Sequence, residues 1–213
     1  MPESPLNIIV SGVGGQGTVL AGKLLAQCAL ASGACVRSAE TIGMAQRGGS
    51  VLGHVRIASP GCPPPASPLV PAGEAQLLIG FEPAEALRAY GLCAPGALVV
   101  CATAPLLPPT ASLQRTSYDG RAQLAALAEE EAAGRIAALV LVDNAAVLAT
   151  LGFNRALNVV LLGTALATLE ASGHACPAIR YDAMRATLAT SLAPQYLDPN
   201  LQALEIGYTL PCR

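Results

Sequence analysis

A short apolar run that ends in a glycine-rich loop constrains the fold more than any other feature of this sequence. Leu6 to Ser11 is apolar on both faces of a strand, as expected for a central parallel strand covered by helices on each side. Gly12 to Gly17 (GVGGQG) follows at once. Thr18 to Ser32 then has a nearly all-round apolar surface, so we expect a largely buried helix there. This order predicts the first unit of an α/β domain.

Strands and helices are expected to alternate along the rest of the chain. The patterns predict strands at about 34–39, 50–58, 76–81, 97–102 and 138–142, and helices at about 83–90, 121–133 and 158–172. The strand at 34–39 would complete a β-α-β unit with the first strand and helix. The tail, at 181–191 and 198–208, is expected to be helical or irregular. We therefore predict an α/β fold: one three-layer α/β/α domain over residues 1–213, with a mainly parallel sheet.

Composition excludes several classes of function. The net charge of −2 gives no broad field for a nucleic acid. No apolar run reaches the roughly 18 residues of a membrane span and no leader is evident, so we expect a cytoplasmic protein without a membrane partner. Seven cysteines lack a C-x-x-C pair and two histidines lack a metal-ligand spacing, so we predict no metal site and no catalytic residue. With only 12% charged residues, apolar surface can remain for another protein to cover, which favours a subunit.

The glycine loop lies where a phosphate-binding loop would lie, between a strand and a helix. Its glycines allow close backbone approach, and the N-terminus of the following helix can hold an anion, with Gln16 or Thr18 adding hydrogen bonds. The alternative is that these glycines only permit tight packing of strand and helix. Gly17-x4-Gly22-Lys23 matches most of a P-loop, but Leu24 replaces the magnesium-binding hydroxyl, so we reject ATP hydrolysis.

Glu40 lies about 20 residues past the loop, where a dinucleotide-binding domain places the acid that holds a ribose hydroxyl. A stand-alone Rossmann-like protein that binds NAD(P) or FAD is therefore one alternative. A purely structural interaction subunit, in which the glycine loops only pack, is another.

A second loop, Ile42 to Gly49 (IGMAQRGG), has neither strand alternation nor helix length. Arg47 can fork onto a phosphate or carboxylate, or it can be a solvated loop residue. His54 lacks a neighbour placed by the sequence as a catalytic partner, so we interpret it as structural rather than catalytic. The stretch 59–73 contains six prolines and is expected to be a surface excursion.

Several segments carry a resemblance to a known family. The blocks NIIVSGVGGQGTVLAGKLLAQCAL and SAETIGMAQRGGSVLGHVRI resemble the opening of the γ-type subunits of 2-oxoacid:ferredoxin oxidoreductases, those for indolepyruvate in particular. The resemblance continues in SPLVPAGEAQLLIGFEPAEALRA, ALNVVLLGTAL and NLQALEIG, so it spans nearly the whole chain. The sequence departs from the family pattern at Ile42, Gln76 and Cys101, where histidine, an acid and asparagine are usual.

The resemblance implies a division of labour with a large subunit. That partner would carry thiamine diphosphate, Mg²⁺ and 4Fe-4S clusters and decarboxylate an aryl-pyruvate, with electrons passing to ferredoxin and the acyl group to coenzyme A (CoA). This chain, a non-autonomous subunit of an oxidoreductase, would close the active site and hold CoA. The residues predicted to form the cofactor-binding surface are Gly12, Gly14, Gly15, Gln16, Gly17, Thr18, Glu40, Met44, Gln46, Arg47 and Gly48.

Overall fold

The computed structural model describes residues 4–43, 48–106, 118–151, 156–174 and 176–210. Its strands are β1 (Leu6–Val13), β2 (Cys35–Ile42), β3 (Ser50–Ala58), β4 (Ala75–Gly80), β5 (Cys93–Ala102) and β6 (Ile136–Val142). Its helices are α1 (Thr18–Ala31), α2 (Pro83–Ala89), α3 (Arg121–Ala132), α4 (Asn144–Leu151), α5 (Leu157–Ala171), α6 (Tyr181–Ser191) and α7 (Pro194–Thr209), with a short 3₁₀ turn at Tyr90–Leu92. In the parts of the chain given above, no helix is long and apolar enough to cross a membrane.

The strands form one mixed, mostly parallel sheet in the order β2-β3-β1-β4-β5-β6. β1, β4, β5 and β6 run parallel to one another, whereas β3 pairs antiparallel with both β1 and β2. The predicted β-α-β unit is confirmed, because β1 and β2 run parallel and α1 joins them, but β3 lies between the two strands. Apolar alternation predicts that a segment is a strand but not which neighbour it pairs with.

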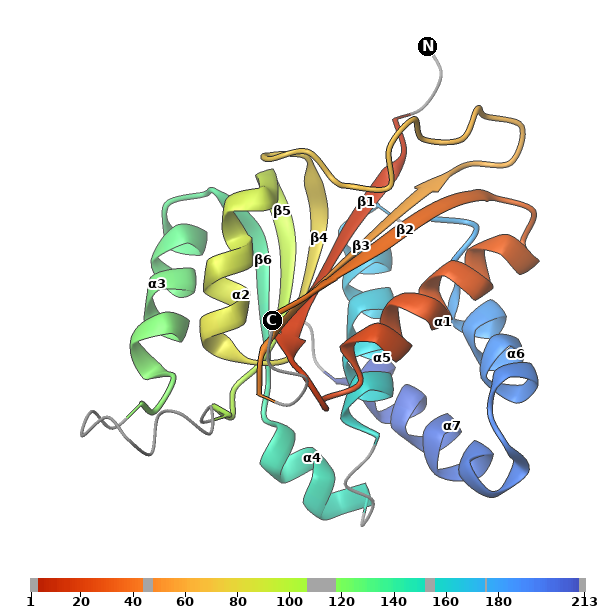
Figure 1. Cartoon of the computed structure of the whole chain (residues 1–213). Coiled ribbons are helices and arrows are strands. Elements are labelled where there is room, and N and C mark those ends of the chain that lie inside the picture. The colour runs from red at the N-terminus through yellow and green to blue at the C-terminus, as the bar shows by residue number, and fades with distance from the viewer. Residues whose placement is uncertain (1–3, 44–47, 107–117, 152–155, 175, 211–213) are drawn as a thin grey trace.

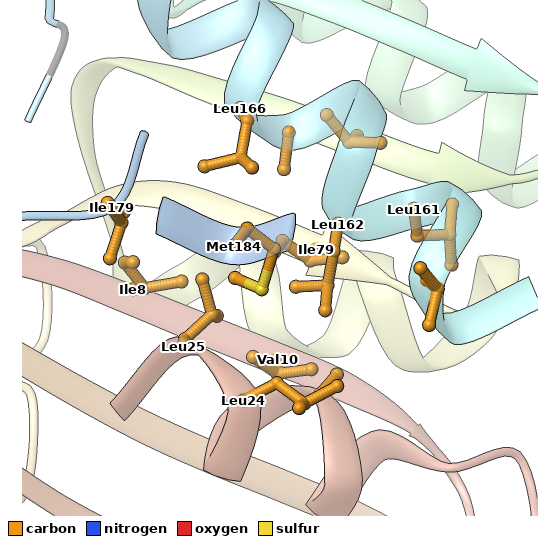
Figure 2. Close-up of a cluster of buried hydrophobic side chains, with 14 of the residues drawn as sticks. Ile8, Val10, Leu24, Leu25, Ile79, Leu161, Leu162, Leu166, Ile179 and Met184 are labelled. Atoms are coloured by element: carbon orange, nitrogen blue, oxygen red, sulfur yellow. The ribbon is translucent and has the colours of Figure 1, made fainter. Parts of the chain in front are cut away.

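Helices cover both faces of the sheet and make the three layers that the sequence predicts (Figure 1). α2 and α3 lie on one face, over a core built around Ile9, Leu78 and Val99. α1, α5, α6 and α7 lie on the other face, over the larger core. Figure 2 shows this second core where α1, α5 and α6 meet the sheet; its labelled residues are Ile8, Val10, Leu24, Leu25, Ile79, Leu161, Leu162, Leu166, Ile179 and Met184.

α1 is less buried than its sequence predicts. Leu24, Leu25 and Cys28 are buried in the core, but Leu20 and Leu30 are 40% and 57% exposed. α1 lies over the β2–β3 side of the sheet, and nothing in the described chain covers its outer face. The outer face of α1 therefore combines these two leucines with the exposed polar residues Lys23 and Gln27.

α5 is the most enclosed helix, because α7 crosses it at very short distance. A β-carbon added to Gly163 would lie 2.3 Å from the Leu204 carbonyl oxygen, and one added to Gly207 would lie 2.0 Å from the Val160 carbonyl oxygen. Thr164 Oγ1 also donates to the Gly207 carbonyl at 2.9 Å. The tail therefore packs against its own domain, and both of its segments are helical.

The proline-rich excursion at 59–73 lies at the surface and is held by polar residues of β3. His54 Nδ1 accepts the Val70 N–H at 3.2 Å. Arg56 donates to Asn7 Oδ1 at 2.8 Å and to the Ser67 carbonyl oxygen at 3.1 Å. The structural interpretation of His54 is confirmed, because its ring nitrogen serves as a backbone acceptor.

Candidate functional site

The glycine loop joins the carboxyl end of β1 to α1, and its glycines are needed for different reasons. Gly15 and Gly17 adopt φ values of 103° and 87°, which side chains with a β-carbon rarely adopt. Gly12 has ordinary φ, but a β-carbon there would lie 2.8 Å from Phe81 Cβ. The loop therefore approaches the start of α2 closely at one end and turns sharply at the other.

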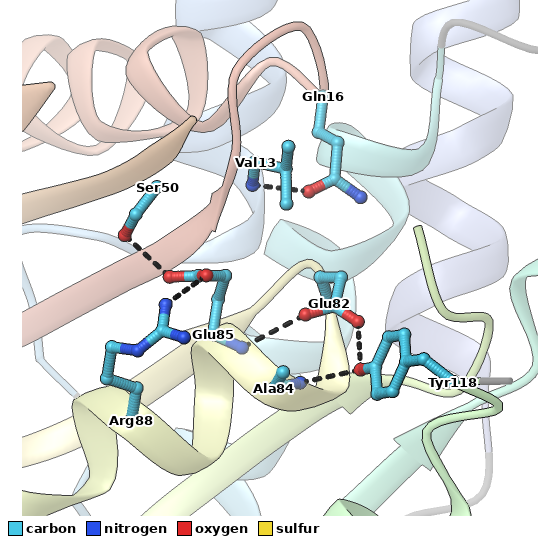
Figure 3. A network of polar contacts seen from close by, with 8 residues as sticks. All are labelled: Val13, Gln16, Ser50, Glu82, Ala84, Glu85, Arg88 and Tyr118. Atoms are coloured by element: carbon cyan, nitrogen blue, oxygen red, sulfur yellow. Dashed lines mark hydrogen bonds and ion pairs between the residues drawn. The ribbon is translucent and has the colours of Figure 1, made fainter. Parts of the chain in front are cut away.

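Gln16 fixes the loop from within. Its Oε1 accepts the Val13 N–H at 2.7 Å, and its Nε2 donates to the Phe81 carbonyl oxygen at 3.0 Å (Figure 3 labels Val13 and Gln16). Both ends of the amide are thus engaged in protein contacts. The predicted contact of Gln16 with a ligand stays a prediction, and its observed role is to tie the loop to the end of β4.

The second glycine-flanked loop meets the first at the same edge of the sheet. Gly14 N donates to the Gly49 carbonyl oxygen at 2.8 Å, and Gly48 N lies 3.5 Å from the Gly14 carbonyl oxygen. Gly48 adopts a φ of 80°. The structure therefore brings Gly48 beside the Gly12–Gly17 loop, whereas Met44, Gln46 and Arg47 lie outside the described residues.

A cavity of about 370 Å³ opens beside this junction. Its lining is mainly apolar and comes from the glycine loop, the start of α1, the end of β2 and the start of β3. The lining residues are Gly14, Gly15, Gly17, Thr18, Val19, Ile42 and Val51. Ile42, where the family pattern usually has histidine, is 59% exposed and extends the apolar lining to the surface.

Two helix N-termini meet at Gly17 without a side-chain cap. α1 has Gly17 and α5 has Ala156 at the capping position, and neither helix has a side-chain cap or an acidic residue in its first turn in the described structure. Among the described residues, no side-chain cap and no first-turn acid therefore offsets the positive dipole ends of the two helices at this junction. Such a junction favours a negatively charged group.

Asn158, in the first turn of α5, lies at this junction and was not anticipated from the sequence. It is only 4% exposed, and its Oδ1 has no hydrogen-bond partner among the residues described. A β-carbon on Gly17 would lie 3.1 Å from Asn158 Nδ2, so the amide occupies space that only glycine leaves free. A buried amide without a partner costs about 1–3 kcal/mol, which marks the residue as a candidate for ligand contact.

Glu40 lies away from this junction. It is an exposed residue of β2, the edge strand, which β3 separates from β1. A dinucleotide-binding domain needs its first two strands adjacent and parallel, so that the acid of the second strand reaches a ligand on the first loop. The strand order therefore does not support the ribose-binding role considered for Glu40.

Two acids at the start of α2, on the face of the sheet opposite to α1, form a hydrogen-bond network next to the site (Figure 3). Glu82 is only 2% exposed and caps α2 by accepting the Glu85 N–H at 3.0 Å. Tyr118 donates its hydroxyl to Glu82 and accepts the Ala84 N–H at 3.0 Å. Burial, followed by this bond to a carboxylate, raises the pKa of Tyr118. The Glu-Pro pair before the helix was the only sequence signal for this cap.

Glu85 connects this network to the second loop. Ser50 Oγ, one residue past Gly49, donates to Glu85 Oε2 at 2.6 Å, and Arg88 forms an ion pair with the same carboxylate. The start of β3 is therefore anchored to α2.

Cys101, another departure from the family pattern, is fully buried near Glu82, and burial raises the pKa of its thiol to about 12.

The fold and the site define a class: an α/β subunit with paired glycine loops at the carboxyl edge of its sheet. The model of the pyruvate ferredoxin/flavodoxin oxidoreductase family matches residues 7–210, so the chain belongs to this family. It is a small subunit of the 2-oxoacid:ferredoxin oxidoreductase kind, and hence a non-autonomous part of an oxidoreductase.

Related proteins agree with this assignment. The chain is 33% identical over 204 residues to indolepyruvate oxidoreductase subunit IorB of Archaeoglobus fulgidus, covering 95% of this chain and 94% of the relative. It is 32% identical over 201 residues to the subunit of the same name from Pyrococcus horikoshii, covering 94% and 93%. The resemblance of the sequence to γ-type subunits is therefore confirmed.

Solved structures share the fold at lower identity. Pyruvate oxidoreductase subunit PORC of Thermotoga maritima superimposes with a TM-score of 0.65 at 18% identity, covering 97% of this chain and 96% of that chain. The 2-oxoglutarate:ferredoxin oxidoreductase of Magnetococcus marinus, solved with 2-oxoglutarate, coenzyme A and succinyl-CoA bound, matches 96% of this chain with a TM-score of 0.63 at 17% identity. The match covers 30% of that longer chain.

Proposed function

We propose that this chain is the small subunit of an indolepyruvate, or other aryl-pyruvate, ferredoxin oxidoreductase, and that it closes the active site of a larger subunit and binds CoA. The names of the curated relatives support the choice of substrate, because both are indolepyruvate oxidoreductase subunits. The larger subunit would hold thiamine diphosphate with Mg²⁺ for decarboxylation and 4Fe-4S clusters for electron transfer to ferredoxin. The acyl product would leave on CoA.

The contact between Gly17 and Asn158 is the observation that carries the CoA part of the proposal. In the described structure, the N-termini of α1 and α5 meet there without side-chain caps or first-turn acids, and the oxygen of the buried Asn158 amide has no partner. Phosphate groups are the ligands that such backbone N–H groups bind best. The Asn158 oxygen can only accept a hydrogen bond, so it would bind an N–H or O–H group of CoA beside the phosphates, from a side chain that is already fixed in place.

The adjacent cavity suits the rest of such a ligand. Its lining is mainly apolar and includes Val19, Ile42 and Val51. CoA combines charged phosphates with a long and less polar arm that ends in a thiol, so the mainly apolar cavity suits that arm while the adjacent helix N-termini suit the phosphates. The residues of this chain would bind and orient CoA and exclude water from the junction with the larger subunit.

A titration of CoA onto the assembled complex tests the proposal. Asn158→Leu should weaken CoA binding by up to roughly tenfold, because it removes the acceptor of one hydrogen bond, which contributes about 0.5–1.5 kcal/mol. Thr168→Val is the matched control, since it makes a buried polar residue apolar about three turns farther along α5 and should leave the affinity unchanged. Arg47→Ala, in the loop that Gly48 ends, should also weaken binding if Arg47 contacts a phosphate.

The alternatives predict different results. If Asn158→Leu leaves the affinity for CoA unchanged in a complex that still assembles, the site at Gly17 is not the CoA site. A purely structural subunit would lose assembly but not affinity in these variants. A stand-alone nucleotide-binding protein would show a thermal shift with NAD(P) or FAD in the absence of any partner, an outcome that the position of β3 between β1 and β2 disfavours.

A further inference from the structure

The two edges of the sheet differ in how their backbone is covered. At the β6 edge, Glu131 of α3 reaches over the strand and its Oε1 accepts the Leu139 N–H at 2.7 Å. At the β2 edge no described side chain does this, although the strand is eight residues long and Arg37, Ser38, Glu40, Thr41 and Ile42 are all exposed. A long open edge strand is a template for pairing with another strand.

The β2 edge also carries uncovered apolar side chains. Ile42, at the carboxyl end of β2, is 59% exposed and lines the cavity with Val19 of α1. Leu30, near the opposite end of α1, is 57% exposed. Val36, near the amino end of β2, is half-buried against the core that contains α1. Val36 and Ile42 point to the same face because even-numbered positions of a strand share a face.

We propose that β2 pairs antiparallel with β2 of a second copy of this chain, around a two-fold axis at Ala39. In an antiparallel pair, two opposed residues either both point their N–H and C=O groups toward the other strand or both point them away. Neighbouring residues of one strand alternate between these two directions. A two-fold axis must therefore pass through a residue that is opposed to itself. An axis at Arg37 or Glu40 would oppose like charges, which destabilises a sheet. An axis at Ser38 would place Val36 opposite a glutamate.

Of the axes at residues 37 to 40, only the one at Ala39 avoids these mismatches. It sets Val36 opposite Ile42 twice, on the α1 face, and Arg37 opposite Thr41 twice on the other. It also brings the Ile42 end of one copy to the Leu30 end of the other, so that each exposed apolar side chain finds an apolar neighbour. Val36 of the second copy then packs on Ile42 and completes the open wall of the cavity beside the glycine loop.

Disulfide trapping of the full chain tests both the pairing and its register. Ala39→Cys places a thiol opposite its own copy, with Cα atoms about 4.5–5.5 Å apart, which suits a disulfide. Ser38→Cys places its two thiols on a diagonal of about 7–8 Å, which does not. Under oxidation, Ala39→Cys should become a covalent dimer, whereas Ser38→Cys and the native chain with its own Cys35 should not.

Charge substitution at the exposed Thr41 provides a second test that leaves the core intact. Thr41→Lys opposes a lysine to Arg37 of the second copy at two places and should raise the dimer dissociation constant on the order of tenfold. Thr41→Glu opposes a carboxylate to the same arginine and should lower or preserve it. Sedimentation equilibrium of the three proteins gives the constants.

Three outcomes with the isolated chain would overturn the proposal. The first is that the chain stays monomeric at high concentration and Ala39→Cys forms no disulfide. The second is that Ser38→Cys forms the covalent dimer as readily as Ala39→Cys. The third is that Thr41→Lys and Thr41→Glu change the dimer dissociation constant in the same way. Trapping of Ala39→Cys to the larger subunit of the assembled complex, instead of to its own copy, would also overturn it and would assign the β2 edge to that partner. None of these outcomes depends on whether the site at Gly17 binds CoA.

Discussion

Asn158 packs its side-chain amide against Gly17, 141 positions earlier in the chain, and its buried Oδ1 has no partner among the residues that the structure describes. We expect Asn158→Leu to stabilise the isolated chain by about 1 kcal/mol, because leucine has nearly the same shape and no group that needs a hydrogen bond. For a chain of this size the melting temperature should rise by roughly 2–4 °C. Calorimetry without ligand measures it. A lower melting temperature would mean that the amide has a stabilising role in the free protein.

Asn158→Leu is informative because its expected effects on stability and on CoA affinity have opposite signs. Replacing a residue that only supports the fold lowers the stability of the protein, and any loss of binding follows from that. Asn158→Leu should instead gain stability in the isolated chain while it loses CoA affinity in the complex. Binding residues are often kept at a cost in stability, so this combination would place Asn158 among them.

The crossing of α5 and α7 supports a second prediction about two glycines. Gly207→Ala should destabilise the chain by more than about 3 kcal/mol, because its β-carbon would lie 2.0 Å from the Val160 carbonyl oxygen and the helices would have to separate. Gly22→Ala, inside α1, is the control. Its β-carbon would lie 3.7 Å from Val55 Cγ2, at ordinary contact distance. Because the substitution removes a glycine from the interior of a helix, it should stabilise the folded chain by about 0.5–1 kcal/mol.

Urea unfolding of both variants checks this pair. The prediction fails if Gly207→Ala unfolds at the same urea concentration as the native chain, or if both substitutions shift the midpoint in the same direction. A Gly207→Ala chain that does not fold at all agrees with the prediction, and Gly163→Ala, whose contact at 2.3 Å is slightly longer, then provides a milder variant.

Much of the fold follows from local patterns. Strands such as β4 and β5 are recognisable because both of their faces are apolar, and the helix between them is recognisable because Pro83 opens it. The position of β3 between β1 and β2 is not recognisable, since strand order depends on contacts between distant segments. α4 was not predicted either. Its eight residues follow β6 directly, and their apolar pattern has no helical periodicity.

The candidate site divides in the same way. The convergence of the two glycine loops is predictable, because each follows a strand and the carboxyl ends of parallel strands meet at one edge. Asn158 is not, since its significance comes from the contact with Gly17 and from the lack of a partner for its oxygen. The one local signal was an asparagine in the first turn of an otherwise apolar helix.

A third prediction concerns pH and His54, which holds the proline-rich excursion through the Val70 N–H. Burial lowers the pKa of His54 in the folded chain below its ordinary value near 6.5. As the pH falls, His54 therefore binds a proton in the unfolded chain before it does so in the folded chain. The contribution of neutral His54 to stability is fully present above the unfolded pKa and is lost as the pH falls through that value toward the folded pKa. His54→Asn keeps an oxygen acceptor for the Val70 N–H but does not titrate. Between pH 7.5 and 5.5, above the range of ordinary carboxylates, the native chain should lose more thermal stability than His54→Asn. An equal loss in both proteins would show that other groups set the pH dependence.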